Sequence, residues 1–140
     1  MIRYVLASHG KMAEGMLDSV RLILGESIEV HTICAYTQGP ENLTEKIEKL
    51  FSCFSQEDQI IVMTDIFGGS VNTEFAGMLA KRKFWLVSGM SLGLVAEILL
   101  IKDESAIEDG IKTAIENTRN MTCLYNSLQE DAADTFDIEI

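Results

Sequence analysis

The sequence is poor in basic residues, proline and histidine. Its 140 residues include 11 lysines and arginines against 22 aspartates and glutamates, one proline and two histidines, for a formal net charge of −11. Nucleic-acid phosphates require clustered basic side chains, so this balance argues against nucleic acid as a partner. The acidic surface favours solubility, with steering toward a basic protein partner as the alternative.

The sequence also lacks a long apolar run. Its longest, Leu92–Ile101, is interrupted by Gly93 and Glu97 and is shorter than the ~20 residues that a bilayer requires. The start, Met1–Ala7, is too short for a signal peptide and has no basic flank leading to a cleavage site. We expect a cytoplasmic protein that reaches a membrane component only through partners.

Cysteine is scarce and forms no metal-binding pair. Cys34, Cys53 and Cys123 lie far apart, and an odd number without an export signal indicates reduced thiols. His31 and Cys34 have a spacing seen in zinc sites, but residues three apart in a strand point to opposite faces. We expect no metal site, and the absence of GxxxxGK[ST] and GxGxxG argues against a nucleotide cofactor.

Strand and helix patterns alternate along the chain. The strands are expected over Ile2–Ala7, Ile28–Ala35, Gln59–Thr64 and Phe84–Ser88. The helices are expected over Lys11–Leu24, Glu41–Phe54, Val71–Lys81, Leu92–Leu100 and from Ser105 to about Asn117. Four strands, each followed by a helix, predict an α/β fold: a single doubly wound domain with a four-stranded parallel sheet and helices on both faces.

Several local signals refine these elements. Pro40 presets the entry of the second helix, Ser70 is expected as the N-cap of the third, and Ser105–Glu108 matches a capping box. Met12 and Met16 have helical spacing and are expected in the core, with a place on the rim next to His9 as the alternative for Met12.

The end of the chain has a different composition. Five acidic residues and no basic ones follow Arg119. Met121–Tyr125 is a candidate fifth strand, whereas Phe136–Ile140 alternates in polarity but is more typical of a frayed tail. We therefore expect one domain over residues 1–125 and an acidic tail over 126–140.

Three loops at predicted strand ends carry unusual residues. The first strand ends in Ser8-His9-Gly10, the third in Asp65–Ser70 and the fourth in Gly89-Met90-Ser91. Parallel strands present their carboxyl ends on one rim, where ligands of such sheets gather. We expect these three loops to lie on that rim.

The residues of this rim suit phosphoryl transfer. A neutral imidazole such as His9 is a good nucleophile near neutral pH, and a carboxylate such as Asp65 fixes its tautomer and stabilises the charge that develops. Gly68 and Gly69 allow backbone N–H groups to approach a phosphoryl group, while Ser70 offers a hydroxyl and the following helix its positive end. Each feature alone also has a structural explanation, because loop histidines are usually surface groups and glycine-serine turns end many strands. Their coincidence favours a functional rim.

Two further side chains are assigned by position. His31 lies in mid-strand with no glycine neighbour, so we expect a packed or edge-exposed histidine without a chemical role. Phe67 lies in a rim loop, which favours exposure and docking of a partner.

The motifs together resemble enzyme IIA of the mannose–fructose–sorbose family of sugar phosphotransferase systems. The resemblance is carried by Val5–Gly10, Ala13–Gly15, Leu24–Glu26, Asp65–Ser70 and Gly89–Leu92. It extends in order and spacing over roughly residues 1 to 120.

The resemblance implies a phosphotransferase component that works through a covalent phosphohistidine, with no metal or nucleotide. His9 would accept phosphate from the phosphocarrier HPr and pass it to a histidine of the IIB component, with Asp65 as the acidic partner. The residues assigned to phosphate or partner binding are Gly10, Phe67, Gly68, Gly69, Ser70, Gly89 and Met90. It also implies a homodimer in which a C-terminal strand, matched by Met121–Tyr125, pairs antiparallel with the partner's sheet. No IIB domain follows, so IIB is expected on a separate chain.

Two departures from the family pattern leave the sugar and the partners open. Many members have Pro-Phe-Asn where this chain has Val71–Thr73, and Asn-Leu-Pro or Asn-Ile-Pro where it has Ser91–Gly93. A related alternative is the phosphotransfer subunit of dihydroxyacetone kinase, which Gly10 and the Asp65–Ser70 stretch disfavour. A third is a non-enzymatic module of flavodoxin or receiver type, which would need a phosphate loop or acidic residues where Ala7-Ser8-His9 stands.

Overall fold

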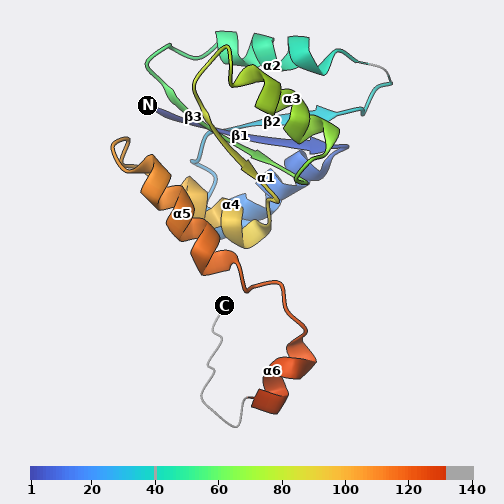
Figure 1. Cartoon of the computed structure of the whole chain (residues 1–140), viewed down its shortest axis with the longest axis vertical. Coiled ribbons are helices and arrows are strands. Elements are labelled where there is room, and N and C mark those ends of the chain that lie inside the picture. Colours follow the sequence, from blue (N-terminus) through green and yellow to red (C-terminus); the bar gives the residue numbers. More distant parts are fainter. Residues whose placement is uncertain (40, 132–140) are drawn as a thin grey trace.

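Four parallel strands form the middle layer of the protein (Figure 1). The computed structural model describes residues 1–39 and 41–131. The strands are β1 (Ile2–His9), β2 (Val30–Ala35), β3 (Gln59–Thr64) and β4 (Trp85–Ser88), in the order β2-β1-β3-β4. All three pairings are parallel, which confirms the predicted sheet. The short, nearly continuous apolar runs are those expected of strands buried on both faces.

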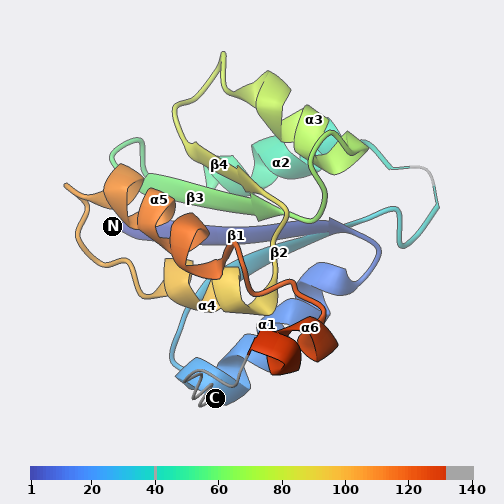
Figure 2. The same cartoon turned by 60° about the horizontal axis from the view of Figure 1, so that its bottom comes forward.

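Helices cover both faces of this sheet (Figures 1 and 2). One face carries α1 (Met12–Leu24), α4 (Leu92–Leu99) and α5 (Ile107–Thr118), and the other carries α2 (Leu43–Ser52) and α3 (Ser70–Met78). Alternate side chains of β1 divide between the two cores, so that Leu6 packs with the first group and Val5 with the second. Within the described part of the chain, no helix has the length and apolarity to cross a membrane.

The order of the strands creates a switch point between β1 and β3. The chain leaves β1 through α1 to reach β2 on one side, and then crosses through α2 to β3 on the other side. The helices that follow β1 and β3 therefore lie on opposite faces of the sheet. The register pairs Ala7 with Thr64, which brings the residues just after these strands together. Such a crevice is the usual ligand position of an open α/β sheet.

The structure at three helix starts differs from what the sequence predicts. Gly69, and not Ser70, is the N-cap of α3, because the Ser70 hydroxyl contacts His9 instead. The predicted capping box does not form: the Ser105 hydroxyl contacts Asp103, and α5 has no side-chain cap. Met12 is the first residue of α1 and is 45% exposed, so it is not part of the core. Pro40 lies outside the described residues.

The antiparallel strand expected at Met121–Tyr125 is not seen in the single chain. Residues 121–124 are irregular and exposed, and Tyr125 begins the short helix α6 (Tyr125–Asp131). A strand needs a neighbour for its backbone N–H and C=O groups, and among the described residues neither sheet edge, β2 or β4, pairs with this segment. Residues 132–140 of the predicted tail, with Phe136–Ile140, lie outside the described part.

Candidate active site

His9 is the last residue of β1 and is held at the rim by the turn that follows. The buried Ser8 hydroxyl accepts the Ala13 N–H at 2.8 Å and donates to the Gly10 carbonyl at 3.1 Å. Gly10 has φ of +60°, a conformation that favours glycine, and its N–H donates to the Ala35 carbonyl at 2.8 Å. The backbone on both sides of His9 is thus fixed while its side chain remains 43% exposed.

Asp65, the first residue after β3, binds His9 through two hydrogen bonds. Its Oδ2 accepts the His9 backbone N–H at 2.7 Å and lies 2.8 Å from Nδ1 of the ring. Its Oδ1 accepts the Ile66 N–H at 2.9 Å. Burial acts to raise the pKa of Asp65, but these hydrogen bonds outweigh it and hold the pKa below its ordinary value. The carboxylate is therefore charged at neutral pH.

This contact defines the state of the imidazole. An ionised carboxylate can only accept hydrogen bonds, so Nδ1 carries the ring proton. In the neutral ring Nε2 then keeps its lone pair. The Ser70 Oγ lies 3.0 Å from Nε2. The ring is consequently held at both nitrogens, and Nε2 faces the start of α3.

The glycines before α3 allow the loop to approach the ring. Gly68 has φ of +77°, which glycine adopts without steric cost. A Cβ on Gly69 would lie 2.6 Å from Cγ2 of Ile66 and 3.2 Å from Cε1 of His9. Only a residue without a side chain therefore brings the N-terminus of α3 this close to the imidazole.

Sequence reasoning missed Tyr36. It follows β2, on the same rim, and its hydroxyl donates to the Ser70 Oγ at 2.9 Å. Its ring centroid lies 5.6 Å from that of His9. Nothing in the sequence around Tyr36 indicated a chemical role, so only its position after the second strand could have pointed to it.

The remaining residues predicted to bind phosphate or a partner differ in how far their side chains are exposed at the rim. Phe67 is 84% exposed, as expected. Gly89 has φ of +79° and directly follows β4, the strand beside β3. The Met90 side chain is only 4% exposed and packs in the core, while its N–H donates to the Thr64 carbonyl at 3.0 Å. Met90 thus supports the rim through its backbone, and its side chain does not face a ligand.

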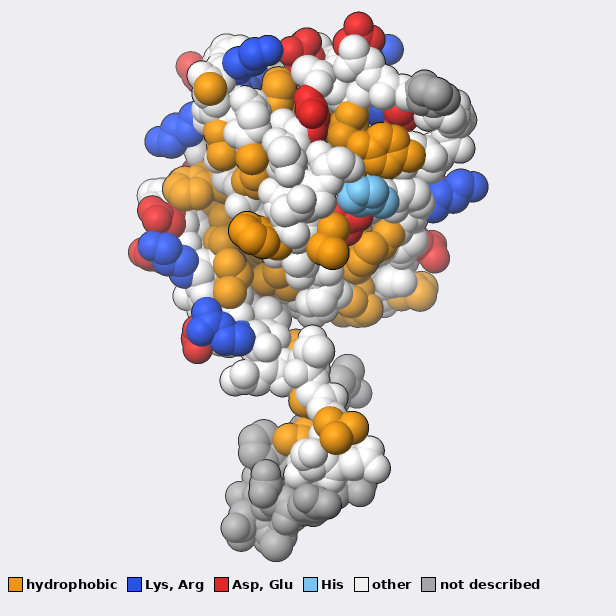
Figure 3. Space-filling model, turned by 45° about the vertical axis from the view of Figure 1, so that its right-hand side comes forward, with side chains coloured by type: hydrophobic (Ala, Val, Ile, Leu, Met, Phe, Trp, Pro, Cys, Tyr) orange, Lys and Arg blue, Asp and Glu red, His pale blue; other side chains and the backbone are white. Residues whose placement is uncertain are grey.

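Exposed apolar side chains accompany the histidine on this face. Figure 3 shows hydrophobic groups gathered around an exposed histidine, and Met12, Tyr36, Ile66 and Phe67 are each more than two-fifths exposed. Apolar side chains that remain exposed around a reactive group are suited to transient contact with another protein.

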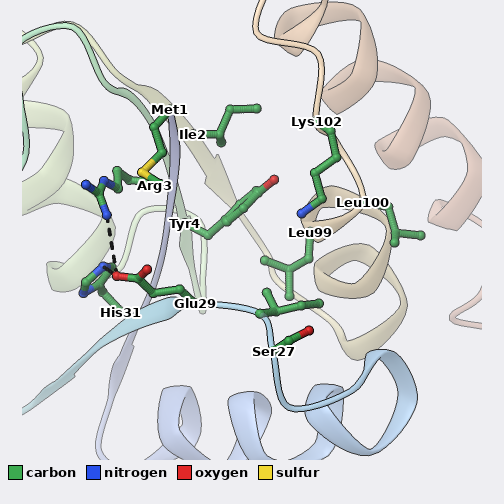
Figure 4. A pocket seen from close by; sticks show the side chains of 11 residues that line it. Met1, Ile2, Arg3, Tyr4, Ser27, Glu29, His31, Leu99, Leu100 and Lys102 are labelled. Carbon is green, nitrogen blue, oxygen red and sulfur yellow. Dashed lines mark ion pairs between the residues drawn. The ribbon is translucent and has the colours of Figure 1, made fainter.

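The second histidine lies in a different environment, near the amino ends of the strands and away from the rim. His31 lines a pocket of about 350 Å³ near the amino ends of β1 and β2 (Figure 4). Its Nε2 is 3.5 Å from Glu29 and has no hydrogen-bond partner, and its ring packs edge-on against Phe54 at 4.9 Å. The His31 ring packs on Phe54, which belongs to the core on one face of the sheet, whereas Cys34 belongs to the core on the other face. His31 and Cys34 therefore point to opposite faces, as predicted.

Comparisons with known proteins give the family to which this α/β fold and its rim belong. Residues 3–115 match the family model described as the PTS system fructose IIA component. The chain therefore belongs to the EIIA family of the mannose, fructose and sorbose phosphotransferase systems, which serve sugar transport.

Individual relatives agree with this family. The chain is 32% identical over 103 residues to the sorbose-specific EIIA component of Klebsiella pneumoniae, covering 71% of this chain and 73% of that protein. It is 23% identical over 111 residues to the fructose-specific EIIA component of Bacillus subtilis, covering 78% and 76%. A crystal structure assigned to a sugar phosphotransferase system permease of Klebsiella pneumoniae is 40% identical, with a TM-score of 0.84 and coverage of 91% and 93%.

Gly69→Ala should displace the His9 ring. The added methyl group meets a side chain held at both nitrogens, so we expect a clear shift of the His9 Cε1–H resonance and a stability loss of about 1–3 kcal/mol from overpacking. Both are measured by ¹H–¹³C NMR and urea unfolding. The control is Gly77→Ala in the same helix, where a Cβ meets nothing within 4 Å and a gain of up to ~1 kcal/mol is expected. An unchanged His9 resonance in Gly69→Ala would contradict the close approach.

Proposed function

We propose that this protein accepts a phosphoryl group from phosphorylated HPr on Nε2 of His9 and passes it to a IIB component on a separate chain. The single observation that carries the proposal is the contact of Asp65 with Nδ1 at 2.8 Å. In the neutral ring it leaves Nε2 as the nitrogen that carries the lone pair, facing the Ser70 hydroxyl.

The transfer step is a displacement at phosphorus. The Nε2 lone pair forms the new N–P bond while the bond from phosphorus to the donor breaks, and its electron pair remains on the donor. The His9 ring, still protonated at Nδ1, becomes cationic as this happens. The Asp65 carboxylate at 2.8 Å offsets that charge. Delivery to the acceptor is a second displacement at phosphorus. A nitrogen of the acceptor attacks, the bond from phosphorus to Nε2 breaks, and its electron pair returns to Nε2.

Donors for the phosphoryl oxygens surround Nε2. The Ser70 hydroxyl is 3.0 Å away, and the first N–H groups of α3 have no acceptor within their own helix. The N-terminal end of a helix also favours negative charge. Gly68 and Gly69 contribute by bringing these N–H groups close. Transfer of this kind depends on positioning and electrostatic stabilisation, which these groups supply without a metal or nucleotide.

The exposed apolar side chains of the rim are proposed as the docking surface. Phe67 at 84% exposure and Ile66 at 59% project from the loop that also holds the imidazole, so one surface can meet HPr and IIB in turn. Both partners, and a cytoplasmic location, follow from the family. A homodimer is a further prediction, for which the exposed Met121, Leu124 and Tyr125 offer apolar surface.

The dihydroxyacetone kinase alternative shares the first half of this mechanism and differs in the acceptor. The relatives described above are EIIA components named for fructose and sorbose, which supports the sugar branch. No contact in the described structure favours the kinase branch.

His9→Gln should abolish phosphorylation. Incubation with phosphorylated HPr carrying ³²P is expected to give an acid-labile, alkali-stable label on the wild-type protein and none on this variant, because no other side chain on the rim offers a free imidazole nitrogen. His31→Gln is the matched control and should retain the label, since His31 lies near the amino ends of the strands, away from the rim. Label that persists on His9→Gln, or that is lost from His31→Gln, would contradict the assignment of His9 as the phosphorylated residue.

Asp65→Asn should slow transfer without unfolding the protein. Loss of the negative charge beside Nδ1 removes the stabilisation of the cationic ring, and a fall on the order of 100-fold in the single-turnover rate is expected. Rapid-quench kinetics measure the rate and circular dichroism the fold. Asp18→Asn, an exposed carboxylate on α1, should leave both unchanged. A variant that transfers at the wild-type rate would show that the carboxylate is dispensable.

A further inference from the structure

Tyr36 belongs to the site by geometry, although the transfer step above does not use it. It comes from the connection between β2 and α2, and its hydroxyl contacts Ser70, which lies 34 positions away in the sequence. The ring is 47% exposed and lies 5.6 Å from the His9 ring, centroid to centroid. Four side chains therefore form one series of hydrogen bonds: Tyr36, His9 and Asp65 from three strand ends, and Ser70 from the start of α3.

The direction of each hydrogen bond in this series is fixed by chemistry. Asp65 accepts the Nδ1 proton of His9, so in the neutral ring, the form that attacks phosphorus, Nε2 can only accept. The hydroxyl of Ser70, 3.0 Å from Nε2, must then donate its single proton to the ring. Since that proton is used, the contact between Tyr36 and Ser70 at 2.9 Å requires the tyrosine to donate. The series runs from Tyr36 through Ser70 and His9 to Asp65.

The backbone of Tyr36 is held in an uncommon conformation. Its φ is +64°, the only positive φ of a residue other than glycine in the described part of the chain. A bulky residue adopts this region only where its surroundings hold it there. Here the Tyr36 N–H donates to Oε1 of Glu41 at 2.9 Å, and Glu41 itself pairs with Lys46 at 3.3 Å. The turn is thus built to direct this side chain toward Ser70.

The resting arrangement has a consequence for transfer. The proton of Ser70 occupies the lone pair of Nε2, which is the electron pair that must attack phosphorus. The hydroxyl therefore has to turn its proton away from the ring when the phosphoryl group arrives. If the Ser70 oxygen is kept in place by a second hydrogen bond, the same proton can pass directly to a phosphoryl oxygen.

We propose, on the basis of the function proposed above, that Tyr36 is a positioning residue that acts through Ser70. Its hydroxyl holds the Ser70 oxygen while the Ser70 proton turns from Nε2 to the phosphoryl group. No bond other than those of the transfer step forms or breaks. The tyrosine contributes by reducing the number of orientations open to Ser70, which is how preorganised donors accelerate a reaction.

A double-mutant cycle tests this role. In single-turnover transfer from phosphorylated HPr, Tyr36→Phe should be about fivefold slower than wild type, as expected for one lost hydrogen bond. Ser70→Ala should be slower still, and the double variant should be no slower than Ser70→Ala, because the tyrosine acts only through the serine. Ser52→Ala, which removes one hydrogen bond of an exposed hydroxyl at the C-terminal end of α2, is the control and should match wild type. A wild-type rate for Tyr36→Phe, or the same fivefold loss in the Ser70→Ala background, would overturn the proposal.

A second readout does not depend on transfer. The ¹⁵N resonance of Nε2 in the unphosphorylated protein reports the hydrogen bond from Ser70, so Tyr36→Phe should shift it and leave Nδ1 unchanged. In the Ser70→Ala background the same substitution should have no effect on Nε2. A protein that shows these shifts but takes no label from HPr would refute the proposed function alone. Normal labelling with no Nε2 shift would refute the role of Tyr36 alone.

Discussion

The hydrogen bond between Nδ1 of His9 and Oδ2 of Asp65, at 2.8 Å, is the contact on which the rest of the site depends. The same oxygen accepts the His9 backbone N–H at 2.7 Å, so one carboxylate fixes the position, the tautomer and the charge balance of the ring. The directions of the hydrogen bonds from Tyr36 to Ser70 and from Ser70 to Nε2 of the neutral ring follow from it. Without Asp65 the imidazole would be a surface histidine with either nitrogen protonated.

The sheet makes this contact possible between residues 56 positions apart. Because β1 and β3 are adjacent and parallel, their carboxyl ends meet, and because their following helices leave to opposite faces, the space between them stays open. The cores on the two faces hold the strands in register, and the buried Ser8 fixes the turn after β1. Backbone groups and side chains from several strands thus converge at one rim, where the proposed transfer takes place.

The fold and the central pair could be predicted from the sequence, because apolar runs ending in Ser8-His9-Gly10 and Asp65–Ser70 are local signals, and a parallel sheet brings such ends together. Tyr36 could not, since its place depends on a left-handed turn held by Glu41. The burial of Met90 depends on packing that a strand-end tripeptide does not encode. The strand expected at Met121–Tyr125 rested on a short pattern, and such a pattern forms a strand only where a neighbour supplies hydrogen bonds.

The ring nitrogen that carries the phosphoryl group gives the most direct test of this account. Long-range ¹H–¹⁵N NMR of the protein phosphorylated by HPr distinguishes the two nitrogens of each histidine. Phosphate is expected on Nε2 of His9, with Nδ1 still protonated and bound to Asp65. Phosphate on Nδ1 of His9 would mean that Asp65 does not occupy that nitrogen in the reacting state, and the mechanism built on this contact would be wrong.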